Sequence, residues 1–194
     1  MRTFCALALV VAACGTDPMT GGGDDGTNTG DDTTGGIIDG AALFADNCTM
    51  CHGADGKGTD DGPQILNPVT GYATYVVRHG RNDMGFPAPM KAFDTATLSD
   101  DEVAAILGFL SMAEKPTTGP ELYGRFCQNC HGETGRAGRV GKNIVREVNN
   151  MASIVRSGHG GTSYGSRTSY MPKWSTSEIT DAELALIKSY VSTL

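Results

Sequence analysis

The clearest hydrophobic pattern in this chain is a helical one, and it occurs twice. Apolar residues recur three or four positions apart near residue 105 and again near the C-terminus, with polar residues between them. This spacing predicts two amphipathic helices, whose buried faces are Val103, Ile106, Leu107 and Leu110 in one, and Leu184, Ile187, Val191 and Leu194 in the other. Strand-like alternation is weak throughout, so the pattern predicts an all-α fold.

Both helices begin at a strong N-terminal signal. Ser99 and Thr180 each have a glutamate three positions later, Glu102 and Glu183, which is the arrangement of a capping box. A second, shorter helix is expected ahead of each of two cysteine pairs, with Pro120 in the first turn of the later one. The predicted elements therefore come in matching sets.

These matching sets form an internal repeat that starts at Gly40. The paired stretches are Gly40 to Phe44 with Gly119 to Tyr123, Val76-Val77-Arg78 with Ile154-Val155-Arg156, and Met90 to Phe93 with Met171 to Trp174. The repeat predicts two small tandem domains, residues 40–115 and 116–194, joined by a short hinge. A purely apolar core is marginal in so small a domain, so each core needs something more than side chains.

The N-terminus reads as an export signal, predicted to end at residue 13. Arg2 precedes an apolar run that is too short to span a bilayer. The run ends in Val11-Ala12-Ala13-Cys14, which resembles the lipobox of bacterial lipoproteins. That resemblance implies cleavage before Cys14 and its lipidation. The alternatives are an ordinary signal peptide cut after Ala13, or a wrongly assigned start codon.

Residues 14–39 are predicted to be a disordered acidic tether. The stretch is rich in Asp, Gly and Thr and contains no Lys or Arg. Such a composition buries too little apolar surface to offset the entropy of ordering. Behind a lipid anchor it would let the folded part reach partners near a membrane.

The cysteines change the picture, because four of the six lie in two copies of one motif. Cys-x-x-Cys-His starts at Cys48 and again at Cys127, 79 positions later. This is the attachment sequence of c-type haem: two thiols one helical turn apart bond the two vinyl groups, and the histidine that follows lies under the iron. The motif predicts two haem c groups, attached through Cys48 and Cys51 with His52, and through Cys127 and Cys130 with His131.

Three other readings of the cysteines explain less. A thioredoxin-type dithiol needs a βαβ pattern, which is missing. A zinc site built from both pairs would need them closer than the 76 positions between Cys51 and Cys127. Two disulfides would leave the histidine after each pair unexplained.

From Gly40 to Leu194 the chain resembles the tandem dihaem class I cytochromes c. The resemblance implies two small all-helical domains, each wrapped around its covalently attached haem. It also implies a methionine from a late loop as sixth iron ligand, a neutral thioether that raises the reduction potential. Here the matching residues are Met90 and Met171.

The two methionines match the family to different degrees. Met171 is followed by Pro172, as in the family, whereas Met90 is followed by Lys91, and Met84 competes with it. The register of the repeat favours Met90. The remaining methionines Met50, Met112 and Met151 are expected to pack in the cores.

Several residues around the motifs have secondary roles in this interpretation. Arg78 and Arg156 match in the repeat and are candidate partners of a haem propionate, with a solvated arginine as the alternative. His79 and His159 are alternative candidates for the sixth ligand, but they do not match in the repeat and are expected to be exposed loop residues. The family's proline after the motif, which steadies the proximal histidine, is found at Pro63, whereas the second copy has Lys142 there.

Charge is distributed unevenly between the copies. Residues 40–115 contain 5 Lys and Arg against 10 Asp and Glu, and residues 116–194 contain 9 against 6. Such a charge dipole steers encounters with charged partners, and it predicts that the second domain docks on an acidic surface. The alternative is a solvated surface with unevenly spread charge. Nothing in the sequence indicates nucleic-acid binding.

The predicted function is electron transfer rather than catalysis. Two six-coordinate irons leave no open position for a substrate, so they can only accept and pass on electrons. The resemblance implies a role outside the cytoplasmic membrane, in the periplasm or at its outer face, between a quinol-oxidising complex and a terminal oxidase or reductase. The alternatives are a dihaem peroxidase, the haem subunit of a dehydrogenase complex, or a haem-based sensor. A peroxidase or a sensor would need one open or labile iron position.

Overall fold

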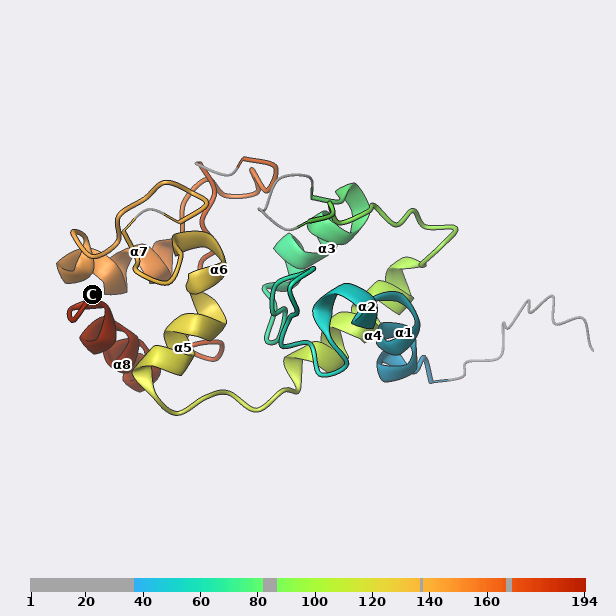
Figure 1. The fold of residues 1–194 in the computed structure, drawn as a ribbon, viewed down its shortest axis with the longest axis horizontal. Helices are drawn as coiled ribbons and strands as arrows, with labels where there is room; N and C mark the ends of the chain where they lie inside the picture. Colours follow the sequence, from blue (N-terminus) through green and yellow to red (C-terminus); the bar gives the residue numbers. More distant parts are fainter. Residues whose placement is uncertain (1–36, 82–86, 137, 167–168) are drawn as a thin grey trace, which may run out of the picture. The chain divides into compact units, whose positions relative to one another are not determined.

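Helices α1 to α4 and helices α5 to α8 form two groups, and in each group the first helix packs against the last (Figure 1). The structure is a computed structural model, and it describes residues 37–81, 87–136, 138–166 and 169–194. Residues 37–194 form one compact unit. Within the described ranges the regular elements are all helical, which confirms the all-α prediction.

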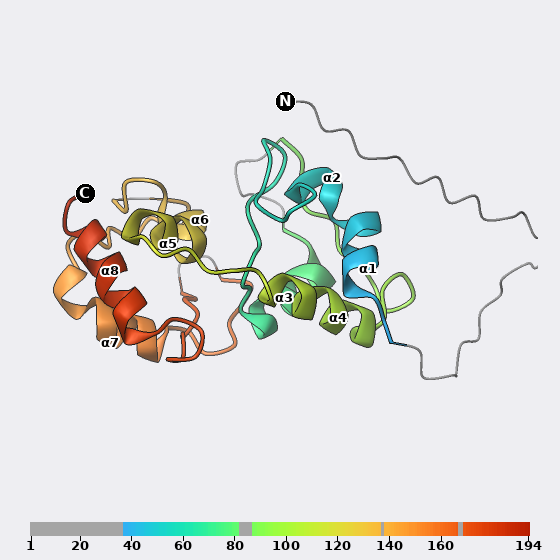
Figure 2. The same ribbon diagram turned by 90° about the horizontal axis from the view of Figure 1, so that it is seen from below.

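In the first group, the first helix in the sequence packs against the last one. The elements are α1 (Gly40–Asn47), α2 (Thr49–His52), α3 (Thr70–His79) and α4 (Asp100–Ser111). Helix α1 lies against α4, and α3 contacts α4 from another side (Figure 2). Phe44 of α1 and Leu110 of α4 belong to one buried cluster that also contains Phe93 from the segment between α3 and α4.

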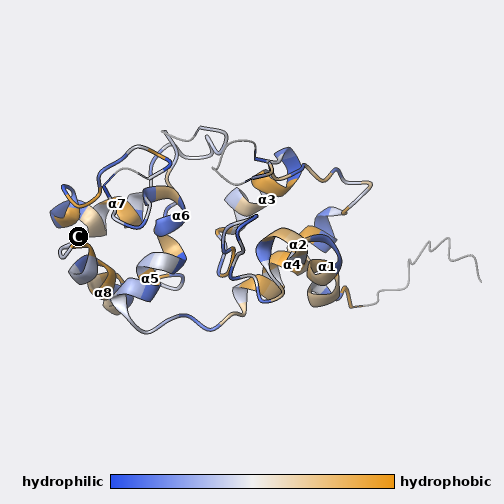
Figure 3. Ribbon diagram, viewed as in Figure 1, coloured by the Kyte–Doolittle hydropathy of each residue, from blue (hydrophilic) through white to orange (hydrophobic). Residues whose placement is uncertain are grey.

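The second group repeats this plan. Its elements are α5 (Gly119–Phe126), α6 (Gln128–His131), the 3-10 helix η1 (Val148–Asn150), α7 (Met151–Ser157) and α8 (Asp181–Val191). Helix α5 lies against α8 as α1 does against α4. Leu122 and Tyr123 are fully buried against Ile187 and Val191. In both groups hydrophobic and polar residues alternate along the helices (Figure 3), as expected where one face covers a core.

The predicted helix starts are confirmed. The Ser99 hydroxyl accepts a hydrogen bond from the backbone N–H of Glu102, and the glutamate side chain accepts one from the Ser99 backbone. Thr180 and Glu183 form the same capping box at α8. The predicted buried faces are confirmed except at Leu194, which lies beyond the end of α8 and is only partly buried.

The methionines outside the proposed iron sites divide into two classes. Met151 is buried in the second core, as predicted. Met50 and Met112 are 85% and 77% exposed, so the prediction that they pack in the cores is wrong. Met112 follows the last turn of α4, and Met50 lies on the outer side of α2, so neither faces a core.

Several predicted features lie outside the described residues. These are the signal peptide, the lipidated Cys14, the tether as far as residue 36, and Met84. The last tether residue, Asp39, is described and is the N-cap of α1, where its carboxylate accepts hydrogen bonds from the backbone of Ala41 and Ala42. Across the part of the chain that is described, no helix combines the length and apolar character needed to cross a bilayer.

Candidate functional site

Each Cys-x-x-Cys-His motif forms a single helical turn. Cys48 is the residue between α1 and α2, and the backbone N–H of His52 donates to the Cys48 carbonyl at 3.0 Å. Cys127 and His131 make the same bond at 3.0 Å in the second motif. One turn brings the first thiol, the second thiol and the imidazole to the same side of the chain, as attachment to one haem edge requires.

In the second group this side of the motif faces a cavity of about 410 Å³. Cys127, Cys130 and His131 line it, and so does Met171, which is forty positions away in the sequence. Most of the remaining wall is apolar, with Ile144, Val155 and Trp174 among its residues. A mainly apolar cavity with a few convergent polar groups is typical of a cofactor site, and its size is within the usual range.

Met171 is held in position by a short antiparallel bridge. Its backbone N–H and C=O both bond to His159, each at 2.9 Å. The chain turns at Gly158, whose φ of +64° is left-handed, and a Cβ there would approach the Met171 carbonyl to 2.9 Å. The bridge therefore fixes the backbone of Met171, and the lining of the cavity includes its side chain.

The first group positions Met90 in the same way. Met90 and Arg81 form an antiparallel bridge with two hydrogen bonds of 2.9 Å. Cys48 and Met90 both pack against the first core, and His52 is buried. Met90 is thus the structural counterpart of Met171, which supports its choice as sixth ligand. Its competitor Met84 lies outside the described residues.

The motif histidines His52 and His131 differ in the hydrogen bonding of their Nδ1 atoms. Nδ1 of His52 lies 2.8 Å from the carbonyl oxygen of Pro63 and is placed to donate a hydrogen bond to it. The other ring nitrogen, Nε2, is then the one that can bind a metal. Nδ1 of His131 is buried and directed toward the Lys142 carbonyl, but its geometry falls short of a hydrogen bond. Burial lowers the pKa of both imidazoles, which favours the neutral form that ligates iron.

The first thiol of each motif is poorly suited to thiolate chemistry. Burial raises the pKa of Cys48 to about 11 and that of Cys127 to about 12. Both thiols are therefore protonated at neutral pH when no metal is bound, unlike the low-pKa attacking thiol of a redox dithiol. Among the described residues, no group of three or more His, Cys, Asp or Glu side chains comes together.

Arg78 and Arg156 occupy equivalent places and make equivalent bonds. Nη1 of Arg78 donates to the carbonyls of Phe93 and Leu98, and Nη2 donates to Asp100 at 2.6 Å. Arg156 clamps the corresponding segment, with Asp181 at 2.7 Å. The Nε of Arg78 is buried with no hydrogen-bond partner, and Arg156 is not among the residues that line the second cavity, so the propionate role of both arginines stays a prediction.

The two remaining histidines are exposed, in agreement with expectation, but neither is a plain loop residue. His79 is the last residue of α3 and stacks on Tyr75. His159 lies beside Met171 and lines the second cavity, as Tyr170 does. Sequence reasoning placed neither residue at the cavity, although the position of Tyr170 directly before Met171 was a usable signal for that residue.

These observations fit a haem c group in each half of the chain. In the second half, two thiols, an imidazole and a thioether converge on one mainly apolar cavity. His131 is itself buried in that wall. Nitrogen and thioether ligands in this combination are those of an electron-transfer haem.

Comparison with known proteins gives an independent result. A family model described as cytochrome C oxidase, cbb3-type, subunit III, matches residues 36–110 and again residues 114–191. Subunit FixP of the cbb3-type cytochrome c oxidase of Azorhizobium caulinodans is 28% identical over 179 residues, which cover 80% of this chain and 59% of that protein. Subunits CcoP of Azospirillum sp. (strain B510) and Rhodobacter capsulatus are also 28% identical, with 80% of this chain and 61% of each relative covered. The chain spans about three fifths of the length of these curated relatives.

Proposed function

Because the chain belongs to the family of subunit III of cbb3-type cytochrome c oxidase, we propose that it passes electrons to a terminal oxidase or reductase. Its two tandem cytochrome c domains bind haem c, and the helical structure agrees with that fold. The relatives are named as subunits of an oxidase, which supports an oxidase as the partner.

The observation that carries the proposal is the convergence of Cys127, Cys130, His131 and Met171 on one cavity. Haem c, when bound, supplies an iron that takes up and releases one electron. The two cysteines would hold the group covalently, and the imidazole of His131 and the thioether of Met171 would both bind its iron. An iron bound in this way would have no open position for a substrate and would serve to transfer electrons.

Other residues at each site hold the histidine and methionine ligands in position and exclude water from them. The Pro63 carbonyl orients the imidazole of His52, and the bridges at Arg81 and His159 fix the methionine backbones. In the second site, apolar side chains such as Ile144 and Trp174 exclude water from the cavity. Rigid, desolvated ligands keep structural change during electron transfer small.

We propose that the protein works outside the cytoplasmic membrane on a lipid anchor. In this proposal residues 1–13 are a signal peptide, Cys14 carries the lipid, residues 14–39 are the tether, and the domains are 40–115 and 116–194. The lipobox-like sequence and the family match over 36–110 and 114–191 support it. Replacement Cys14→Ser should release the protein from the membrane fraction, and mass spectrometry of the mature N-terminus checks the lipid.

The proposed donor is a quinol-oxidising complex, and the positive second domain is the proposed docking side. Four basic residues follow the second motif closely: Arg136, Arg139, Lys142 and Arg146. Screening by salt weakens attraction between exposed charges. Transfer rates that stay constant as ionic strength rises would contradict this docking proposal.

The test of the electron-transfer proposal is the optical spectrum of the fully reduced protein before and after addition of carbon monoxide. No spectral change at either site is expected, because a methionine bound to each iron would leave no position for carbon monoxide. Rapid binding of carbon monoxide at one site would instead indicate an open iron and favour a haem enzyme such as a peroxidase.

A further inference from the structure

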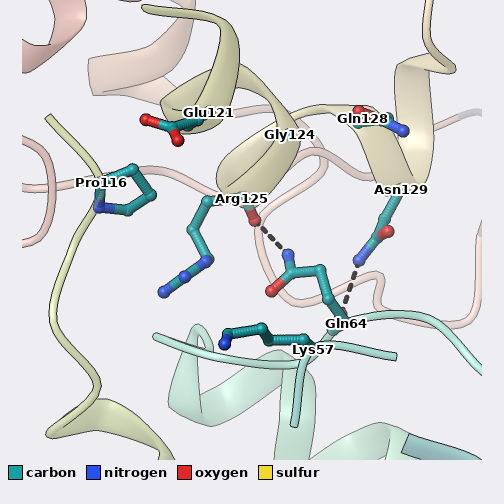
Figure 4. A pocket seen from close by; sticks show the side chains of 8 residues that line it. All are labelled: Lys57, Gln64, Pro116, Glu121, Gly124, Arg125, Gln128 and Asn129. Atoms are coloured by element: carbon teal, nitrogen blue, oxygen red, sulfur yellow. Dashed lines mark hydrogen bonds between the residues drawn. The ribbon is translucent and has the colours of Figure 1, made fainter. Parts of the chain in front are cut away.

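The attachment turn of the second site is hydrogen-bonded to the loop that orients the first proximal histidine. Nδ2 of Asn129 donates to the backbone carbonyl of Gln64 at 2.8 Å, and Figure 4 shows this bond beside a second one from the Gln64 side chain. Asn129 lies between Cys127 and Cys130 in the second motif. The contact therefore starts inside one haem-attachment sequence.

Gln64 leads directly to the other site. It follows Pro63, whose carbonyl oxygen lies 2.8 Å from Nδ1 of His52. Only one covalent peptide segment, from the Pro63 carbonyl to the Gln64 carbonyl, separates the two hydrogen bonds. On the other side, Asn129 is covalently joined to Cys130. The connection from the His52 imidazole to the Cys130 thiol is continuous, with two hydrogen bonds and no gap through space.

The connection is not a general property of the motif. The residue at the same place in the first motif is Met50, which is 85% exposed and cannot form such a bond. Asn129 is only partly exposed, and its amide is directed at Gln64 (Figure 4). The same motif position thus faces solvent in one copy and the other half of the chain in the second.

Further hydrogen bonds join the two halves of the chain beside this connection. Nε2 of Gln64 donates to the carbonyl of Arg125 at 2.5 Å, and Nη1 of Arg125 donates to Oδ1 of Asn67 at 2.6 Å. Burial lowers the pKa of Arg125, but its guanidinium stays charged. Asn67 in turn donates to the carbonyl of Ala113 at 2.9 Å, which ties the loop to the end of α4.

We propose that the segment His52–Pro63–Gln64–Asn129–Cys130 is the route by which an electron crosses between the two haem sites. The inference rests on the proposed electron-transfer function. One electron moves and no proton moves, so one site is oxidised by one electron and the other is reduced by it. Asn129 acts as a positioning residue, because its amide closes the connection and touches neither iron.

Other contacts keep the two halves together when this bond is removed. Tyr72 and Tyr170 stack with centroids 5.2 Å apart, and the Tyr164 hydroxyl packs on Gly71. Lys115 forms an ion pair with Glu183 at 2.9 Å. A change at Asn129 is therefore expected to break the route and leave the junction closed.

The experiment compares Asn129→Ala with Met50→Ala in the haem-loaded full chain. Each variant is reduced by one electron with a photoexcited donor, and equilibration between the two sites is followed optically. Asn129→Ala should slow equilibration several-fold with both reduction potentials unchanged. Met50→Ala, the matched change in the first motif, should leave the rate unchanged. Amide hydrogen exchange of residues 64–67 should be faster in Asn129→Ala than in Met50→Ala, because only Asn129→Ala removes a hydrogen bond from this loop.

A third variant separates the electron route from the packing of the two halves of the chain against each other. Gln64→Ala removes the bond to Arg125 but keeps the backbone carbonyl that Asn129 reaches, so its rate should stay near that of the unmodified protein. Equal rates in Asn129→Ala and Met50→Ala would overturn the inference, and so would equal slowing in Gln64→Ala and Asn129→Ala. If the unmodified protein shows no exchange between sites at all, the electron-transfer proposal itself fails.

Discussion

A Cβ atom on Gly40 would lie 2.1 Å from the carbonyl oxygen of Ala105, at the point where α1 meets α4. The second group has the same feature, since a Cβ on Gly119 would lie 2.5 Å from the carbonyl oxygen of Leu186 in α8. Neither carbonyl can move without shifting its helix. Glycine therefore sets how closely the first and last helices of each group approach, and with it the shape of the core.

Replacement Gly40→Ala is expected to destabilise the protein. The added methyl group overlaps a backbone atom, and overpacking of this kind costs about 1–3 kcal/mol in the free energy of unfolding. Gly108→Ala is the matched control, because it lies in α4 with no heavy atom within 4 Å of the added Cβ. That change should stabilise the helix by about 0.5–1 kcal/mol. Denaturant unfolding followed by circular dichroism measures both, and equal stabilities would refute the argument.

The Arg78 clamp is expected to stabilise the fold mainly through its carbonyl contacts. Its side chain is 14% exposed, whereas that of its ion-pair partner Asp100 is 80% exposed. Loss of charged hydrogen bonds to the carbonyls in Arg78→Ala should cost about 1.5–3 kcal/mol. Asp100→Asn weakens only a solvent-screened pair and should cost less than about 1 kcal/mol. Thermal unfolding of the two variants decides between the effects, and a cost at Asp100→Asn equal to that at Arg78→Ala would assign the stabilisation to the ion pair.

The Ser99 capping box predicts a pH-dependent contribution to stability. The backbone N–H and hydroxyl of Ser99 hold the pKa of Glu102 below its ordinary value of 4.5. A carboxyl with a depressed pKa stabilises the folded state above its ordinary value, and this contribution is lost as the pH falls through the folded-state pKa. Glu102→Gln should therefore lower stability at neutral pH and have a smaller effect in acid.

Asp101→Asn is the control for the Glu102 experiment, because it removes a negative charge from the same helical turn without touching the Ser99 hydroxyl. Denaturant unfolding at neutral pH and below pH 4.5 compares the two variants. A pH dependence lost equally in both would point to the helix dipole rather than to the box. Ser99→Ala should cost about 1 kcal/mol, as loss of an N-cap usually does.

Local signals in the sequence predicted much of the fold. The capping boxes at Ser99 and Thr180 and the buried faces of α4 and α8 depend on residues a few positions apart, so spacing alone determines them. The internal repeat added long-range information. It placed Met90 in register with Met171, and the structure gives both the same backbone bridge.

What could not be predicted depends on contacts without periodicity. The bond between Asn129 and Gln64 joins residues 65 positions apart, and the variable positions of a Cys-x-x-Cys-His motif give no sign of which one faces a neighbour. The same lack of information explains the wrong prediction for Met50. An apolar residue on a turn of four residues has no periodic pattern from which its burial could be judged.

A direct experiment decides whether Met90 or Met84 is the sixth ligand of the first haem iron. Removal of the thioether that closes the sixth position should let carbon monoxide bind the reduced protein. Met90→Ala is therefore expected to give a new carbon monoxide-dependent spectrum from one of the two sites, and Met171→Ala from the other. Met84→Ala is the matched control and should leave both sites closed.

The double variant Met90→Ala with Met171→Ala should bind two equivalents of carbon monoxide, because the two methionines pack against separate cores. Binding in Met84→Ala but not in Met90→Ala would mean that the bridge at Arg81 fixes Met90 for packing and that Met84 supplies the ligand. The reduction potential adds a second readout. Loss of a thioether that favours ferrous iron should lower the potential of the affected site and leave the other unchanged.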